Sequence, residues 1–140
     1  MYVLDACALL TFLNNEPGSD IVDNLLANAI DDKNAVYMNI VNLIEVHYAN
    51  IRSLGADMAA IILDTILDTS IQVVSVFSDT LFQQSSRLKA AYKCSLADAI
   101  GLATAIELSC QFVTSDHHEL EAVAENESIP FLWLPSHLKK

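Results

Sequence analysis

The sequence predicts an α/β fold, a three-layer α/β/α sandwich with a central, mostly parallel sheet of four or five strands. Two observations favour this class. Short runs rich in β-branched and other apolar residues alternate along the chain with longer segments whose apolar residues recur at helical spacing. Only 3 of the 140 residues are glycine and only 3 are proline, which is typical of long helices with short connections rather than of a turn-rich β-sandwich or barrel.

Five segments have the composition of buried strands. All but the last are followed by a helical segment, as the crossover between parallel strands requires. The predicted strands are Tyr2 to Leu4, Ala35 to Met38, Ile71 to Val76, Gln111 to Thr114 and Pro130 to Leu134.

Seven segments have helical periodicity. Ser19 is the expected N-cap of the second, Asp31 to Asn34 is an expected loop, and Ser78 or Asp79 is the expected cap of the fifth. The predicted helices are Ala6 to Asn14, Asp20 to Ile30, Asn39 to Leu54, Ala56 to Asp68, Asp79 to about Tyr92, Leu96 to Ser109 and His117 to Glu125. The length fits a single domain over residues 1–140.

Charge and cysteine usage restrict the function and the compartment. Lysine and arginine total 7 against 18 acids, a net charge of −11, which excludes a general nucleic-acid coat protein because such binding needs cations. The acids either serve solubility or form a cation site that bridges to an anionic substrate. Three widely spaced cysteines without a zinc-binding pattern indicate a reducing compartment, and no signal peptide is evident, so we expect a cytoplasmic protein. No apolar run of 18 residues occurs, so we expect no membrane span.

Two acids follow predicted strands. Asp5 comes directly after the first strand and Asp116 comes after the fourth, and each precedes a helix. In open α/β sheets, ligands bind beyond the carboxyl ends of the strands. Aspartate is also a good N-cap, and Asp116 with Glu119 fits a capping box. The two roles are compatible, since a capping carboxylate can also face a metal ion.

Two further acids lie on apolar helical segments. Asp98 shares a stripe with Gly101, Leu102 and Ala105. A cap by Ser95 explains a charge near the start of this helix, but not why the rest of the stripe is small or apolar. Glu45 has no cation three or four residues away on its helix, and alone it would be an ordinary surface glutamate.

Convergence of the four acids would require a counter-charge. Two carboxylates about 4 Å apart repel by roughly 4 kcal/mol at an effective dielectric constant near 20. The group must therefore take up protons or bind a cation. Oxygen ligands suit Mg²⁺ or Mn²⁺, which can activate water and stabilise charge on a phosphoryl group.

The four acidic segments, in this order, resemble the PIN-domain family. The matching segments are Val3 to Leu10, Ile44 to Val46, Ser95 to Ala105 and Phe112 to Asp116, of which the third is the most specific. The resemblance extends from Tyr2 to about Leu134 and implies a PIN-like fold. The size and layout are most similar to the VapC-type toxins of bacterial and archaeal toxin–antitoxin pairs.

The resemblance implies a Mg²⁺- or Mn²⁺-dependent endoribonuclease, the toxin component of a type II toxin–antitoxin pair. Asp5, Asp98 and Asp116 would be the principal metal ligands, and Glu45 would hold a second ion or the attacking water. Thr114 would orient a ligand or water through its hydroxyl. Water activated by the metal would then hydrolyse RNA phosphodiester bonds.

The expected partners are an RNA substrate, a cognate antitoxin and a second copy of the chain. The antitoxin would insert a segment into the acidic pocket, and the Ala56 to Asp68 helix could contribute to a homodimer. The candidate phosphate contacts are Arg52, Arg87, Lys89 and Lys93, each of which could instead be a solvated cation of the helix surface.

The alternative function is a catalytically weak or inactive PIN-like module that binds RNA or a protein partner. Cys7 favours it slightly, because the family usually carries Ser, Thr or Asn two residues after the first acid and a thiol is a weaker hydrogen-bond donor. Retention of four mutually repelling acids favours the enzyme. His117 and His118 beside Asp116 are interpreted as exposed polar surface rather than metal ligands.

Overall fold

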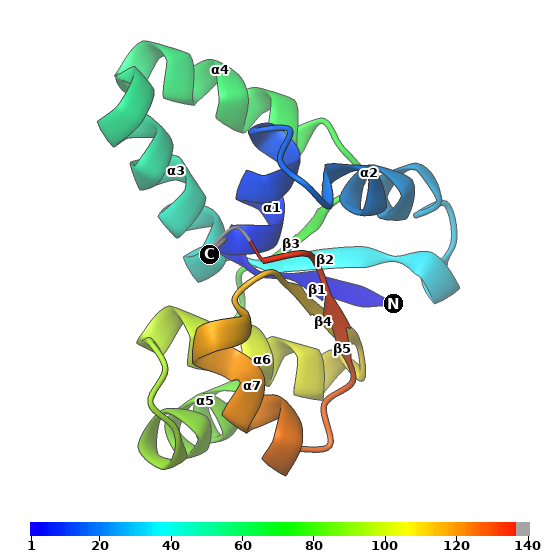
Figure 1. Cartoon of the computed structure of the whole chain (residues 1–140), viewed down its shortest axis with the longest axis vertical. Coiled ribbons are helices and arrows are strands. Elements are labelled where there is room, and N and C mark those ends of the chain that lie inside the picture. Colours follow the sequence, from blue (N-terminus) through cyan, green and yellow to red (C-terminus); the bar gives the residue numbers. More distant parts are fainter. Residues whose placement is uncertain (137–140) are drawn as a thin grey trace.

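The protein is built on one five-stranded parallel sheet with the strand order β3-β2-β1-β4-β5 (Figure 1). The computed structural model describes residues 1–136, and within them seven α-helices and one 3₁₀ helix accompany the sheet. The predicted three-layer α/β/α class is confirmed, and the sheet is parallel throughout.

The strands are short and the helices are longer. The strands are β1 (Tyr2–Leu4), β2 (Val36–Asn39), β3 (Gln72–Val74), β4 (Gln111–Thr114) and β5 (Phe131–Trp133). The helices are α1 (Ala6–Leu13), α2 (Ser19–Ala27), α3 (Ile40–Leu54), α4 (Ala56–Leu67), α5 (Asp79–Ala91), α6 (Leu96–Leu108) and α7 (His117–Asn126), with the 3₁₀ helix at Asp32–Asn34.

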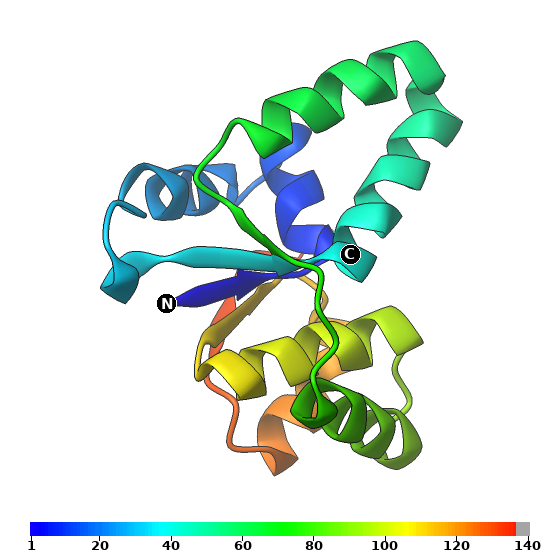
Figure 2. The ribbon, with the colours of Figure 1, turned by 180° about the vertical axis from the view of Figure 1, so that it is seen from behind.

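The helices divide between the two faces of the sheet. α1 to α4 lie on one face and α5 to α7 on the other, as the two opposite views show (Figures 1 and 2). The chain moves from β1 outward to β2 and β3, then returns past β1 to β4 and β5. β1 and β4 therefore flank the point where the strand order reverses, which is where open α/β sheets bind their ligands.

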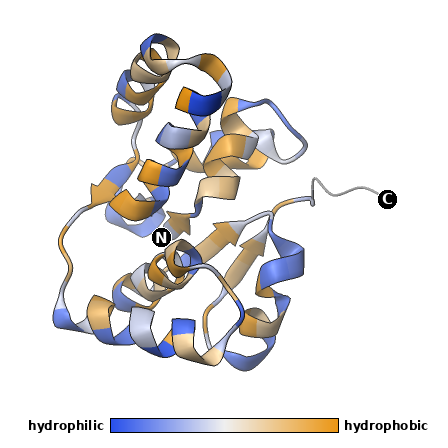
Figure 3. Cartoon of the chain, turned by 90° about the vertical axis from the view of Figure 1, so that its left-hand side faces the viewer, coloured by the Kyte–Doolittle hydropathy of each residue, from blue (hydrophilic) through white to orange (hydrophobic). Residues whose placement is uncertain are grey.

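The core occupies both faces of the central strands. Val3 and Phe112 pack on the α5–α7 side, whereas Leu4 and Val113 pack on the α1–α4 side, and all four are fully buried. The strands are accordingly mostly orange, the colour of hydrophobic residues, in Figure 3. Helix α6 is buried from Ala99 to Ala105, as its nearly uniform apolar sequence predicted.

The second helix differs from its prediction at both ends. Gly18 occupies the N-cap position with a φ of +102°, a conformation that glycine adopts without strain. Ser19 is the first helical residue, and its hydroxyl donates to Asn15 Oδ1 at 3.2 Å instead of capping the helix. The helix ends at Ala27, and Ile30, the last residue of the predicted helix, is 87% exposed.

Other differences concern element boundaries. The expected loop at residues 31–34 contains a 3₁₀ turn, because the Asp31 carboxylate accepts a hydrogen bond from the Asn34 amide at 3.0 Å. The third strand stops at Val74, and Val76 is 76% exposed. Among the described residues, no helix has the length and apolar character needed to cross a membrane.

Candidate metal and phosphodiester site

Four acids from distant parts of the sequence line one cavity of about 280 Å³. Asp5 follows β1, Glu45 lies on α3, Asp98 lies in the first turn of α6 and Asp116 follows β4. The cavity therefore lies at the carboxyl edge of the sheet, at the reversal of strand order between β1 and β4. Lysine and arginine are absent from the described residues that line it.

Asp5 is the most buried of the four acids, at 2% exposure. Its Oδ1 accepts a hydrogen bond from the Ala8 amide at 2.8 Å, which makes it the N-cap of α1. Its Oδ2 accepts a hydrogen bond from the Thr114 hydroxyl at 2.5 Å. Burial raises the pKa of Asp5 from 3.8 to about 7, and the charges of Asp98 and Asp116 act in the same direction against these hydrogen bonds.

Thr114 connects two of the acids. While its hydroxyl donates to Asp5, the same oxygen accepts a hydrogen bond from the Asp116 amide at 3.0 Å. The contact follows from the sheet register, in which Leu4 pairs with Val113, so that the next residues along each segment, Asp5 and Thr114, lie next to each other. Thr114 is fully buried and orients the Asp5 carboxylate.

Asp98 and Asp116 also cap helices. Ser95 and Asp98 form a reciprocal capping box at the start of α6, as the sequence predicted. Asp116 is the N-cap of α7, and its Oδ1 accepts a hydrogen bond from the Glu119 amide at 3.1 Å. Burial raises the pKa of Asp98, and the charge of Asp116 adds to this. Three helix N-termini, each with a partial positive charge, thus point at the acidic cavity.

Glu45 and Cys7 also line the cavity. Burial and the charge of Asp98 raise the pKa of Glu45. Burial also raises the pKa of the Cys7 thiol, and the charges of Asp5, Asp116, Asp98 and Glu45 raise it further. The Cys7 thiol therefore lies close enough to all four acids for their charges to act on it.

The four predicted phosphate contacts lie in different places. Arg52 lies on α3 seven residues after Glu45, and Lys93 lies two residues before Ser95, a residue of the cavity wall. Lys89 lines a separate groove beside α6. Of these cations, Arg52 is the one whose guanidinium contacts a residue of the acidic cavity.

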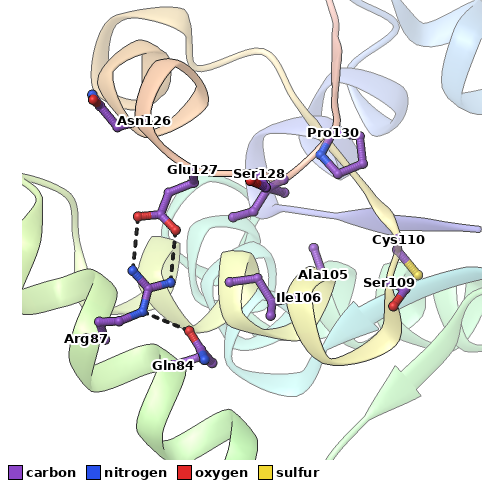
Figure 4. Close-up of a pocket in the computed structure, with 11 residues that line it drawn as sticks. Gln84, Arg87, Ala105, Ile106, Ser109, Cys110, Asn126, Glu127, Ser128 and Pro130 are labelled. Carbon is purple, nitrogen blue, oxygen red and sulfur yellow. Dashed lines mark hydrogen bonds and ion pairs between the residues drawn. The ribbon is translucent and has the colours of Figure 1, made fainter.

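Arg87 contributes to another cavity, of about 640 Å³ (Figure 4). Its guanidinium forms two hydrogen bonds to the carboxylate of Glu127, at 2.9 and 3.0 Å. Cys110 and Pro130, which precede β4 and β5, also line this cavity, so it lies at the amino edge of the sheet. The structure therefore does not bring Arg87 together with the four acids.

Sequence reasoning missed three residues that cap α3, the helix that carries Glu45, or lie on it. Asn39 caps α3 and donates from Nδ2 to the Thr104 hydroxyl at 3.1 Å, and Asn42 Nδ2 donates to the Ala97 carbonyl at 3.1 Å. Tyr48 lines the acidic cavity. The spacing of Tyr48 three residues after Glu45 places both on one face of the helix, and this signal could have identified it.

The donor set fits a divalent cation in its chemistry. Carboxylate oxygens are the ligands that Mg²⁺ and Mn²⁺ prefer. Burial, with a smaller contribution from neighbouring negative charge, raises the pKa of Asp5, Glu45 and Asp98, and a bound cation would offset this cost of ionisation. Among residues 1–136, no three His, Cys, Asp or Glu side chains already form a group arranged to hold an ion. Side-chain rotation would therefore accompany binding. His117 is engaged elsewhere, with Nε2 2.7 Å from the Leu134 carbonyl oxygen.

The chain belongs to the PIN-domain family, whose model matches residues 2–126. PIN domains are typically nucleases and are generally metal-dependent. No curated protein matches the sequence.

Solved structures of other proteins share the fold at low sequence identity. The VapBC2 structure of Rickettsia felis, bound to a DNA fragment from its promoter, matches with a TM-score of 0.72 and 14% identity over 95% of this chain and 98% of that chain. VapC20 of Mycobacterium tuberculosis, a toxin that cleaves the sarcin–ricin loop, matches with a TM-score of 0.66 and 18% identity over 87% and 95%. FitAcB of Neisseria gonorrhoeae matches with a TM-score of 0.67 and 17% identity over 99% and 100%. The fold is therefore that of the VapC-like toxins.

Proposed function

We propose that this protein is a divalent-metal-dependent endoribonuclease that hydrolyses RNA phosphodiester bonds. The observation that carries the proposal is the meeting of Asp5, Glu45, Asp98 and Asp116 in one cavity at the reversal point of the sheet. A set of mutually repelling acids is stabilised by a bound cation, and an acidic chain with a bound cation can attract a phosphate.

Each acid has a distinct part in the proposed reaction. Asp5, Asp98 and Asp116 would hold Mg²⁺ or Mn²⁺, with Thr114 fixing the orientation of Asp5. An ion held there would supply Lewis-acid chemistry, namely activation of water and stabilisation of the negative charge that develops on the scissile phosphate. Glu45, which reaches the cavity from α3, would position the attacking water.

We also propose that the protein is the toxin component of a type II toxin–antitoxin pair. The structures of related folds include complexes of toxin and antitoxin. Exposed apolar side chains on α3 and α4, such as Ile44 at 55% and Ile61 at 59% exposure, support contact with an antitoxin or a second copy of the chain.

The test of the nuclease is cleavage of a mixed pool of RNAs with Mg²⁺ or Mn²⁺, beside an EDTA control. Asp98→Asn keeps a side-chain oxygen for the Ser95 cap but removes the charge, and we expect cleavage to fall about a hundredfold or more. Asp64→Asn, at an exposed position of α4, is the matched control and should cut like the wild type. Folded wild-type protein, free of any partner, that cuts no RNA with either metal would favour the non-cutting binding module.

A further inference from the structure

Tyr48 is an exposed aromatic residue at the mouth of the acidic cavity. It lines the cavity with Glu45 and Asp98, and its side chain is 44% exposed. The other exposed aromatic residues in the described part of the chain, Phe77 and Phe82, line a different groove beside α6. Tyr48 therefore offers an aromatic surface next to the acids without belonging to the core.

Arg52 packs against this ring. Its guanidinium carbon lies 5.0 Å from the centroid of the Tyr48 ring, within the range of a cation–π contact. Glu45, Tyr48, Ala49 and Arg52 follow one another at i, i+3, i+4 and i+7 on α3, so they form one continuous face. Arg52 lies about 10 Å along the helix from Glu45, farther from the cavity floor.

The charge of Arg52 is available to a ligand. Within residues 1–136 the ion pair is that of Arg87 with Glu127, and Arg52 has no carboxylate partner. Arginine planes and tyrosine rings are the surfaces on which proteins stack unpaired bases, while the guanidinium also attracts phosphate. A base can stack only where it is not held inside a duplex.

We propose that Tyr48 and Arg52 form a platform on which an unpaired nucleobase beside the scissile phosphate stacks, with Arg52 also contacting the RNA backbone. The inference rests on the proposed function, because it assigns the substrate-binding surface of the same site. Duplex RNA keeps its bases paired and is therefore a poor ligand for this surface. The platform also supplies the positive charge that the cavity lining lacks.

The test compares Tyr48→Leu with Tyr48→Trp in binding of a labelled single-stranded RNA in EDTA, which reports the platform without catalysis. We expect Tyr48→Leu, which keeps the apolar bulk but loses the aromatic face, to weaken binding about tenfold, and Tyr48→Trp to retain it. Arg52→Ala removes one phosphate contact, so the slope of log K against log salt concentration should become less negative by about 0.7. Arg52→Lys should keep this slope and lose part of the affinity. Phe82→Leu is the matched aromatic control and Lys33→Ala the matched cation control.

A substrate series identifies the stacked base. RNAs carrying one abasic nucleotide at successive positions should show a position at which Tyr48→Leu no longer weakens binding, because the stacking partner is already gone. In cleavage assays with Mn²⁺, Tyr48→Leu should raise KM with little change in kcat.

The outcomes separate the two proposals. Wild-type-like binding and cleavage by Tyr48→Leu would overturn the platform and leave the nuclease standing. Tyr48-dependent RNA binding without cleavage would support the platform and overturn the nuclease. Equal affinity of the wild type for duplex and single-stranded RNA would also overturn the platform.

Discussion

Asp5 is the residue whose charge is least compatible with the metal-free fold. It is buried, it faces two other acids, and its pKa in the folded protein is about 7 against 3.8 in the unfolded chain. An acid whose pKa rises on folding binds protons more tightly in the folded state. Its contribution to stability is therefore complete below about pH 4 and is lost as the pH rises through 7. A divalent cation would offset this loss.

The first prediction follows from this sign. In EDTA at pH 8, Asp5→Asn should increase the free energy of unfolding by about 2–4 kcal/mol, because an uncharged amide replaces a buried carboxylate and can still meet Ala8 and Thr114. The gain should shrink toward zero near pH 4. Thermal and urea unfolding across pH 4–8, with Asp64→Asn as control, measures it. A variant less stable than the wild type at pH 8 would show that the carboxylate is not strained by its surroundings.

At the scale of elements, the site depends on how closely α6 approaches α3. Gly101 on α6 faces Asn42 on α3, and a Cβ at position 101 would lie 2.9 Å from Asn42 Oδ1 and 3.2 Å from the ring of Phe112. Asn42 is fully buried, and its Nδ2 is held by the Ala97 carbonyl. This contact fixes α3, and with it Glu45, against the start of α6, where Asp98 lies.

The second prediction concerns this contact. Alanine is normally the better helix former by about 1 kcal/mol, yet Gly101→Ala should destabilise the protein by about 1–3 kcal/mol, since the packed side chains must move. In an Asn42→Ala background the same change should cost less, because the nearest atom is gone. Chemical denaturation of the four proteins in this cycle measures both effects. A net gain in stability from Gly101→Ala alone would contradict the close approach of the two helices.

At the scale of the whole molecule, the sequence predicted elements better than long-range contacts. Periodicity and capping residues located all five strands and seven helices, including the caps at Asp5, Ser95 and Asp116. The sequence-based prediction misplaced the N-cap of the second helix. Serine is a favoured N-cap residue, but in the structure Gly18 occupies the N-cap position and Ser19 is the first helical residue. Patterns of period 2 and 3.6 report local faces and carry no information on distant partners.

The candidate site shows the same division. The four acids could be identified in the sequence, whereas their common cavity depends on the sheet order, which places β1 beside β4 across more than a hundred residues. The pairing of Arg87 with Glu127, 40 residues away, has no signature in the sequence. The contact of Thr114 with Asp5 has no local signature either, since it joins residues 109 positions apart.

The most direct test of the central claim is calorimetric titration of Mn²⁺ into metal-free wild-type protein, Asp5→Asn, Asp98→Asn and the control Asp64→Asn at pH 7.5. If the acids form a cation site, the wild type and Asp64→Asn bind Mn²⁺ saturably, while Asp5→Asn and Asp98→Asn bind it at least about tenfold more weakly. Equal binding by all four proteins, or no binding by the folded wild type, would contradict the assignment of this cavity as a metal site.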